Sequence, residues 1–234
     1  MCTVSIVPVP DGCRVVCNRD ERRTRAAAEP PRAFPTEVSW ATYPRDPVSG
    51  GTWIGVNDDG LVVALLNRTV AGSEPRVPAQ SRGAIVPTLL ACPSIAQALR
   101  AYDSLDLNRF EPFRIVMTHR STIAVVAGDR SHSSAELFPL VRPVLFTSSS
   151  LGDALVETPR RRLFEELVLA GDDWLDGQYR FHRHRWAGWP EVSVHMTRQD
   201  AATVSRTTID VTSRDIDLHY ESLAGQVSSR RPAA

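Results

Sequence analysis

The second residue of the chain is a cysteine, and this position gives it two chemical functions. If Met1 is removed, Cys2 carries a thiol nucleophile and a free α-amine that serves as its own base. The amine titrates at about pH 8 and the thiol at about pH 8.5, so a modest shift gives a thiolate and a proton acceptor at neutral pH. Position alone favours a small apolar strand residue, so the catalytic interpretation depends on the polar neighbours of Cys2.

The run Asn18-Arg19-Asp20-Glu21 provides polar groups that could support such a nucleophile. The guanidinium of Arg19 can orient a substrate carbonyl or lower a thiol pKa, and the carboxylate of Asp20 can hold an α-amine. Alone, a charged cluster of this kind is more typical of an exposed, salt-bridged loop. Its role depends on whether the fold brings it to Cys2.

The first 17 residues predict the hairpin that does so. Thr3 to Val9 is β-branched and apolar, and Cys13 to Cys17 is again strand-like. Asp11-Gly12 between them is a strong signal for a two-residue turn. We therefore expect the charged run to fold back onto Cys2.

The turn also predicts a register. With Asp11 and Gly12 as the loop, Cys2 lies opposite Glu21 and Arg19 is a diagonal neighbour, whereas a three-residue loop places Cys2 opposite Asp20. Because Arg19 and the α-ammonium both favour the thiolate, Arg19→Ala should slow alkylation of Cys2 more than any change at Cys13 or Cys17.

Two later positions also suit an acyl-transfer site. Asn67 ends a second predicted hairpin of strands 52–56 and 61–66, where its amide could stabilise an oxyanion or simply form a turn. Arg160 to Arg162 occupy the first turn of a helix predicted to begin at Thr158-Pro159, where cations oppose the helix dipole. Either Arg160 points inward with the apolar face of the helix, or all three arginines are solvated.

Composition limits the partners. The 27 basic and 27 acidic residues cancel, which argues against a nucleic-acid or anionic-membrane surface. No apolar run approaches the roughly 20 residues of a membrane span, and the start lacks the basic region of a secretory signal. We expect a cytoplasmic protein acting on a small molecule; the sequence indicates no oligomeric state.

No cofactor or metal is predicted. His182 and His184 form one isolated His-x-His, which is more typical of a basic surface loop than of a metal or haem site. Cys13 and Cys17 are four residues apart on one predicted strand, about 13 Å, so they do not bridge each other. Reduced thiols are expected.

The order of elements predicts the α+β class. Hairpins separated by paired helices, without regular βαβ alternation, favour antiparallel sheets with segregated helix layers. Residues 1–221 are expected to form one domain and residues 222–234 a frayed tail. The other predicted elements are an irregular segment at 22–35, a strand at 38–43, a loop at 73–80, helices from 83, from Ser94 and from Thr158 to Gly171, and strands at 114–119, 122–127, 144–147, 192–196, 203–211 and 216–220.

Together these residues resemble the NRDE family, which includes the transport and Golgi organisation 2 proteins and is named for the four residues found here at 18–21. The resemblance covers most of the chain in order. Its motifs are Met1-Cys2-Thr3, Asn18-Arg19-Asp20-Glu21, Gly50-Gly51-Thr52-Trp53, Asn67, Ser81-Arg82-Gly83 and Glu157-Thr158-Pro159.

The NRDE family is in turn similar to the N-terminal-nucleophile hydrolases, especially the choloylglycine-type amidases. This resemblance implies a four-layer αββα sandwich of two antiparallel sheets. It implies Cys2 as nucleophile, Arg19 and Asp20 as active-site polar groups, and Asn67 as oxyanion donor. The side chains that we expect to bind substrate are Asn18, Glu21, Trp53, Arg160 and Arg161.

The chain departs from the amidases at two places, and its late arginine is left open. They space the Arg and Asp three residues apart, whereas here Arg19 and Asp20 are adjacent. Where they carry a second asparagine, this chain has Thr147-Ser148-Ser149-Ser150. The family pattern Thr-Pro-x-Arg favours Arg161, whereas periodicity favours Arg160, and both remain candidates.

The leading hypothesis is a cysteine hydrolase of a linear amide. The rival is a non-catalytic binding or trafficking module for haem or another small ligand, because eukaryotic relatives are implicated in haem handling and secretory organisation. In that case the histidines would contribute to ligand binding.

Overall fold

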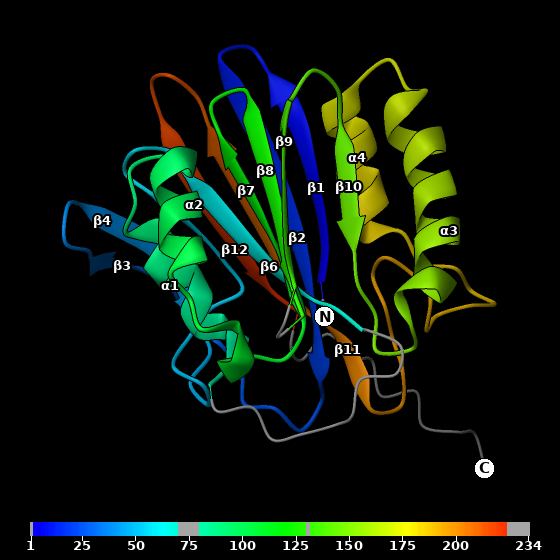
Figure 1. Cartoon of the computed structure of the whole chain (residues 1–234). Helices are drawn as coiled ribbons and strands as arrows, with labels where there is room; N and C mark the ends of the chain where they lie inside the picture. Colours follow the sequence, from blue (N-terminus) through cyan, green and yellow to red (C-terminus); the bar gives the residue numbers. More distant parts are fainter. Residues whose placement is uncertain (1, 70–79, 130–131, 224–234) are drawn as a thin grey trace.

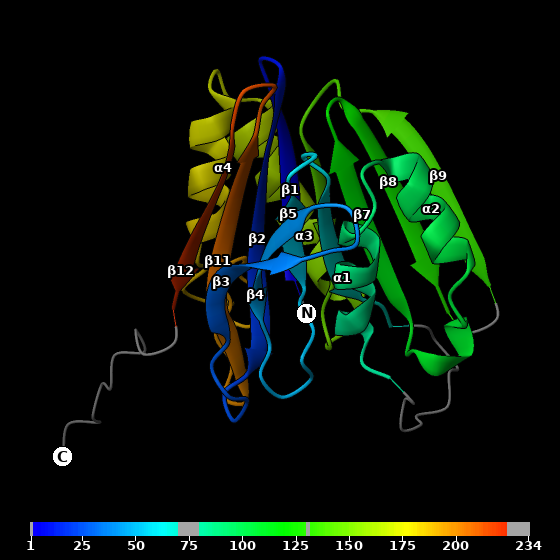
Figure 2. The same cartoon turned by 90° about the vertical axis from the view of Figure 1, so that its left-hand side faces the viewer.

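The computed structural model describes residues 2–69, 80–129 and 132–223. In this part of the chain two antiparallel sheets pack face to face and helices cover the outer face of each (Figure 1). Figure 1 shows α1 and α2 on one side of the two sheets and α3 and α4 on the other, and Figure 2 views the molecule from the side of α1 and α2. The predicted α+β class and αββα sandwich are confirmed.

The first sheet contains the N-terminal hairpin at its centre. Its five strands run in the order β10-β1-β2-β11-β12, so that distant parts of the sequence flank Cys2. The strands are β1 (Cys2–Val9), β2 (Gly12–Arg22), β10 (Val144–Thr147), β11 (Ala201–Val211) and β12 (Ile216–Ser222).

The second sheet is a meander whose seven strands follow sequence order. Each strand pairs with the next, as expected where short turns join antiparallel neighbours. The strands are β3 (Glu29–Pro35), β4 (Trp40–Arg45), β5 (Ile54–Asn57), β6 (Val62–Asn67), β7 (Phe113–His119), β8 (Thr122–Gly128) and β9 (Ser133–Pro139).

Each helix packs its apolar face against the outer side of a sheet. Ser94 accepts a hydrogen bond from the backbone N of Gln97 and so caps α2, which confirms the predicted helix start. The outer side of the second sheet carries the 3₁₀ turn η1 (Arg82–Ala84), α1 (Ile85–Leu90), α2 (Ile95–Asp103) and the 3₁₀ turn η2 (Leu107–Arg109). The outer side of the first sheet is covered by α3 (Asp153–Phe164), the π-helical turn η3 (Glu165–Leu169) and α4 (Trp174–Arg183).

Alternation along the strands determines which side chains fill the space between the sheets. Cys2, Val4 and Ile6 of β1 point into this central core, whereas Val7 packs with the helices on the outer face. The same period on β2 places Cys13 and Cys17 in the central core. Cys2 is therefore one end of an apolar row, and that row orients its thiol.

The hairpin register differs from the predicted one by two residues. Val9 pairs with Gly12, so the turn is Pro10-Asp11, and Cys2 pairs with Arg19 rather than with Glu21 or Asp20. Asp11 itself adopts the left-handed conformation, with φ of 59°, which aspartate tolerates in turns. A shift of two keeps every side chain on its predicted face.

Several elements lie where the sequence predicted other structure. Residues 29–35 form β3 instead of an irregular segment, and β9 was not foreseen. Pro159 lies inside α3, which begins five residues before the predicted N-cap Thr158. Residues 192–196 form no strand, and Ser222 ends β12 instead of a tail. The predicted loop at 73–80, except Gln80, and the predicted tail beyond Leu223 lie outside the described residues.

Candidate active site

Cys2 and Arg19 are direct partners on β1 and β2, and both are buried. Residues opposite each other in an antiparallel pair carry their side chains on the same face. The thiol and the guanidinium therefore lie on the inner side of the first sheet. The hairpin therefore brings Arg19 beside Cys2, as the sequence predicted.

Alternation divides the NRDE run between two faces of β2. Arg19 and Glu21 line the same pocket as Cys2, whereas Asn18 and Asp20 point to the helix side of the sheet. The Asn18 amide donates to the backbone oxygens of His182 and Val194, at 2.8 and 3.0 Å. Asn18 was expected to bind substrate, but its side chain does not line this pocket. It instead anchors α4 and the segment that follows it.

The pocket has a volume of about 440 Å³ and lies at the end of the sandwich where β1 begins and β6 ends. Outside the NRDE run, the predicted site residues Cys2, Trp53 and Asn67 line the pocket, whereas Arg160 and Arg161 do not. Gly83 from the predicted Ser81-Arg82-Gly83 motif also lines it. The structure thus brings motifs from five separate parts of the sequence together around one cavity.

Arg19 is held in place by two groups. Its Nη2 donates to Oδ2 of Asp46, and its guanidinium carbon lies 4.0 Å from the centre of the Trp53 ring, in a cation–π contact. Asp46 also accepts from Nε of Arg25 at 2.7 Å. Burial acts to raise the pKa of Asp46, but hydrogen bonds from Arg25 and the Ser49 backbone, with the charge of Arg19, lower it to about 2.

The loop that carries Asp46 explains the glycines of the motif. Gly50 has φ of 71°, a conformation that glycine adopts without strain. A Cβ at Gly51 would lie 2.4 Å from the carbonyl carbon of Gly83, so only glycine permits the two motif loops to touch. The backbone N of Thr52 donates to the Gly83 oxygen at 3.0 Å across this contact. Asp46 was missed in the sequence, although it precedes a Pro and lies close to the Gly-Gly pair.

The thiol of Cys2 has a second thiol, that of Cys17, as a hydrogen-bond partner. Cys17 donates a hydrogen bond to the Cys2 sulfur, and this bond is the main cause that lowers the pKa of Cys2. Burial opposes the shift, while the N-terminal charge and, least of all, Arg19 add to it. The pKa of Cys17 is raised correspondingly. The expectation that Arg19 is the principal activator is therefore corrected.

The backbone nitrogen of Cys2 is held by Ser148, the residue that follows β10. It donates to Oγ of Ser148 at 3.2 Å, and the Ser148 backbone N donates to the Cys2 oxygen at 3.0 Å. Ser148 belongs to the Thr-Ser-Ser-Ser run that replaces an amidase asparagine. That departure was the sequence signal for this contact, but its role was not foreseen.

Asp20 and Arg160 form a buried layer behind the pocket. Oδ1 of Asp20 accepts from Thr203 at 2.6 Å, and its Oδ2 lies 4.0 Å from Nη2 of Arg160. Burial raises the pKa of Asp20, against the opposing effects of Arg160, Thr203 and the N-terminal charge. Arg160 is fully buried and donates to the hydroxyls of Thr3 and Thr147, each at 2.8 Å.

This arrangement decides between the two candidate arginines. The helical periodicity was right, because Arg160 points inward, although it contacts β1 and β10 from behind and does not line the pocket. Arg161 is half exposed and pairs with Glu157 at 2.7 Å, so the choice made from the family pattern is wrong about which arginine points inward.

The histidine cluster is not the predicted surface loop. His182 lies in α4 and is fully buried; its Nε2 is 2.7 Å from Oγ of Ser5 and its Nδ1 is 3.2 Å from Oδ1 of Asn18. Burial lowers its pKa, so the ring is neutral at pH 7. His184 instead packs edge-on against Trp186. Neither histidine lines the Cys2 pocket.

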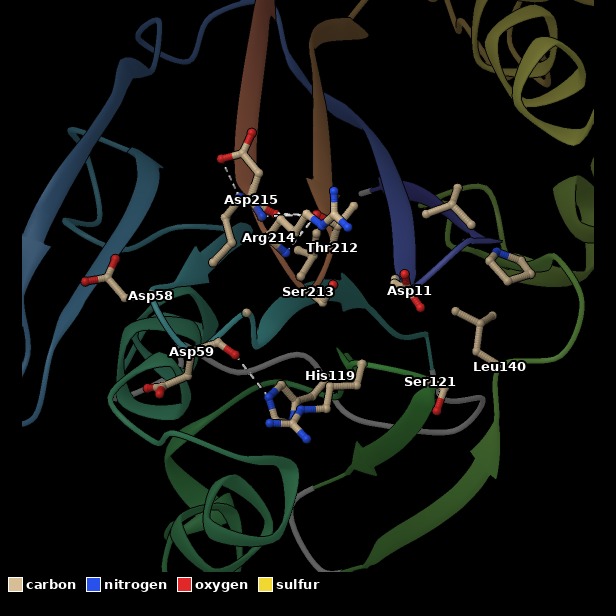
Figure 3. A pocket seen from close by; sticks show the side chains of 17 residues that line it. Asp11, Asp58, Asp59, His119, Ser121, Leu140, Thr212, Ser213, Arg214 and Asp215 are labelled. Carbon is tan, nitrogen blue, oxygen red and sulfur yellow. Dashed lines mark hydrogen bonds between the residues drawn. The ribbon is translucent and has the colours of Figure 1, made fainter.

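A larger pocket, of about 940 Å³, lies at the opposite end of the β1–β2 hairpin (Figure 3). It is surrounded by turns, and His119 contacts the backbone oxygen of Asp59 at 3.0 Å within it. None of the predicted catalytic or substrate-binding residues lines it. Size alone therefore does not identify the candidate active site.

Two general features of the described residues complete the site. Within residues 2–69, 80–129 and 132–223, no group of three or more His, Cys, Asp and Glu side chains is arranged to hold a metal ion. In the same ranges no helix is both long enough and apolar enough to cross a bilayer.

The fold is that of the N-terminal-nucleophile hydrolases. The Caenorhabditis elegans N-acylethanolamine-hydrolyzing acid amidase ortholog is similar with a TM-score of 0.58 and 13% identity, over 88% of this chain and 92% of that one. Penicillin V acylase from Agrobacterium tumefaciens gives 0.54 and 11%, over 96% and 87%. A C2A mutant of conjugated bile acid hydrolase from Clostridium perfringens gives 0.53 and 10%, over 95% and 92%.

The chain belongs to the transport and Golgi organisation 2 family, whose model matches residues 14–169. The predicted family resemblance is thereby confirmed. The matched range contains the NRDE run, Trp53, Asn67 and Arg160 but not Cys2. No curated protein matches the chain in sequence.

Proposed function

We propose that the chain is a cysteine amidohydrolase that cleaves a linear carbon–nitrogen bond, with Cys2 as its N-terminal nucleophile. The observation that carries this proposal is the placement of Cys2 opposite Arg19 in a pocket that Asn67 also lines. The fold agrees with it, because the similar solved structures are by title an amidase, an acylase and a hydrolase. We further propose that the protein works in the cytoplasm, where its four unpaired cysteines remain reduced.

The reaction begins with Met1 removed. The Cys2 thiolate adds to the amide carbonyl carbon, and the carbonyl electrons move to oxygen. The α-ammonium then gives its proton to the amide nitrogen, the C–N bond breaks and the amine leaves. The α-amine next takes a proton from water, which attacks the thioester, releases the acid and restores the thiolate.

Each polar neighbour has a separate task. The side-chain amide of Asn67 donates to the oxyanion, which carries charge only during the reaction. Ser148 holds the Cys2 nitrogen, and Cys17 stabilises the thiolate by its hydrogen bond. Arg19, fixed by Asp46 and Trp53, orients the substrate carbonyl from the facing strand.

The substrate is a small polar amide rather than a long apolar one. Apart from Trp53 and Leu65, the larger side chains that line the pocket are polar or charged, and they include Arg22, Arg25 and Arg82. Such a wall favours an acyl group or amine with its own hydrogen-bonding atoms. Glu21 and Trp53 are the residues we propose to contact it.

A panel of linear amides tests the proposal. Amides of polar acyl groups should protect Cys2 from alkylation and should be hydrolysed, and Cys2→Ala should abolish turnover. Cys13→Ala is the matched control, because Cys13 lies in the same core but at the other end of β2. Hydrolysis that persists in Cys2→Ala would contradict the proposal, as would a panel in which no amide either protects the thiol or is cleaved.

A further inference from the structure

A second thiol lies beside the proposed nucleophile and has no bond-making part in amide cleavage. Cys17 is fully buried on β2 and pairs with Val4, while its neighbour two positions on, Arg19, pairs with Cys2. Cys17 is thus the diagonal neighbour of Cys2 on the same face of the sheet. Both belong to one core cluster, and their thiols share a hydrogen bond.

The geometry is close to that of a disulfide. Diagonal neighbours lie about 7–8 Å apart at Cα, slightly beyond the roughly 6.8 Å that a disulfide usually spans, so the backbones must move closer. The two thiols lie on the same face of the sheet and interact with each other, so the bond requires an approach of the two backbones at this point. Cys2 is the first residue of β1, and a strand end moves more easily than its centre.

Access differs between the two thiols. Cys2 lines the pocket, whereas Cys17 does not and has no exposed surface. A small oxidant in the pocket therefore meets Cys2 first. The buried Cys17 is positioned to react next.

We propose that Cys2 and Cys17 form a reversible disulfide when a peroxide oxidises Cys2, and that this bond switches the pocket off. The disulfide would consume the nucleophile and also the thiol that activates it. It goes beyond the proposed hydrolysis, although both depend on a reactive Cys2.

The steps balance in atoms and electrons. The Cys2 thiolate attacks one oxygen of hydrogen peroxide, the O–O bond breaks, and hydroxide leaves with Cys2 as a sulfenic acid. The Cys17 sulfur then attacks the Cys2 sulfur, the S–O bond breaks, and water forms with the proton from Cys17. The protein loses two electrons and the peroxide gains them. A dithiol reductant reverses the change by thiol–disulfide exchange.

The chain offers matched controls. Cys13 lies on the same face of β2 but pairs with Pro8 and contacts the Thr118 hydroxyl at 3.8 Å. It is four residues from Cys17, about 13 Å along the strand. Cys92 packs against the other core cluster, beneath α1 and α2.

The experiment treats the reduced full chain with hydrogen peroxide, blocks free thiols and maps the peptides by mass spectrometry. We expect a peptide that joins Cys2 to Cys17, two remaining free thiols at Cys13 and Cys92, and full recovery of all four thiols with dithiothreitol. Cys13→Ala should give the same linked peptide. Cys17→Ala and Cys17→Ser should give none, and Cys2 should instead advance to the sulfinic acid.

Sulfinic acid at Cys2 with a free Cys17 thiol in the wild-type protein would overturn the proposal, and so would a disulfide that includes Cys13 or Cys92. Because the readout is a mass, it needs no substrate. A linked peptide in a protein that cleaves no amide would sink only the hydrolase proposal, whereas amide cleavage without the linked peptide would sink only the disulfide.

Discussion

Cys2 and Arg19 lie directly opposite each other on the two strands of the N-terminal hairpin. A single hairpin turn is therefore enough to bring the second residue of the chain to the NRDE run. The end of β10 and the strand β11 then add Ser148 and Thr203 from distant sequence. The local hairpin positions the nucleophile, and the rest of the sheet supplies the groups around it.

The activation of Cys2 predicts an order of effects on its alkylation rate. Cys17→Ala removes the hydrogen bond that contributes most to the lowered pKa, so alkylation by iodoacetamide at pH 7 should slow about tenfold. Arg19→Ala should have the smaller effect, because its charge contributes least. A stopped time course with mass spectrometry measures both rates. A larger effect of Arg19→Ala would restore the order expected from the sequence.

Arg160 and Arg161 are adjacent, which makes them a matched pair for stability. Arg160→Ala removes a buried guanidinium that bonds Thr3 and Thr147, so it should lower the free energy of unfolding by about 3 kcal/mol. Arg161→Ala removes only a half-exposed ion pair and should cost less than about 0.5 kcal/mol. Urea unfolding compares them, and equal losses would mean that the helix end alone is responsible.

Asp46 predicts a dependence of stability on pH. Its pKa is about 2 in the folded chain, below its ordinary value of 3.8, because Arg25, the Ser49 backbone and Arg19 outweigh the effect of burial. Its contribution of about 2 kcal/mol is present above about pH 4 and is lost as the pH falls through about 2. Asp46→Asn should therefore lower the unfolding free energy at pH 7, and the gap should narrow toward pH 2. A gap independent of pH would contradict the assignment.

Asn67 predicts an effect on turnover rather than on binding. If its amide stabilises the oxyanion, Asn67→Ala should lower kcat about 100-fold and leave KM nearly unchanged. Asn108→Ala, on the exposed turn η2, is the control and should leave both unchanged. The kinetics of an amide found in the panel provide the measurement. A rise in KM with normal kcat would assign Asn67 to substrate binding instead.

The sequence could predict the hairpin and its faces because both depend on local patterns. The β-branched runs before and after Asp11 define two strands, and an error of two residues in register leaves Cys2, Cys17 and Arg19 on one face. The sequence did not show that Cys17, rather than Arg19, has the larger effect on the Cys2 thiol. Counting residues across a turn does not show which side chains meet diagonally.

The missed elements have weak local signals. β9 is largely exposed, so its residues lack the alternation that marks a half-buried strand. α3 carries Pro159 in its interior, which suggested a helix start there instead of a continuation. His182 was assigned to a basic loop because the arginines around it conceal the buried face of α4. Long-range contacts with Ser5 and Asn18 keep that face in the core.

The burial of His182 also changes how the binding-module hypothesis is tested. His182→Ala would leave Ser5 and Asn18 with a missing partner in the core, so loss of ligand binding in that variant would report unfolding. His184→Ala is the informative change, because this ring contacts Trp186 near the surface.

The central claim is that Cys2 is the N-terminal residue of the mature chain and carries an activated thiol. Peptide mapping after a limiting amount of iodoacetamide at pH 7 tests both parts in one measurement. The account predicts an N-terminal peptide that begins at Cys2 and carries the label on its sulfur before Cys13, Cys17 or Cys92 reacts, since burial raises the pKa of Cys13 to about 11 and also raises that of Cys92. A retained Met1 throughout the population, or first labelling of Cys92, would contradict it.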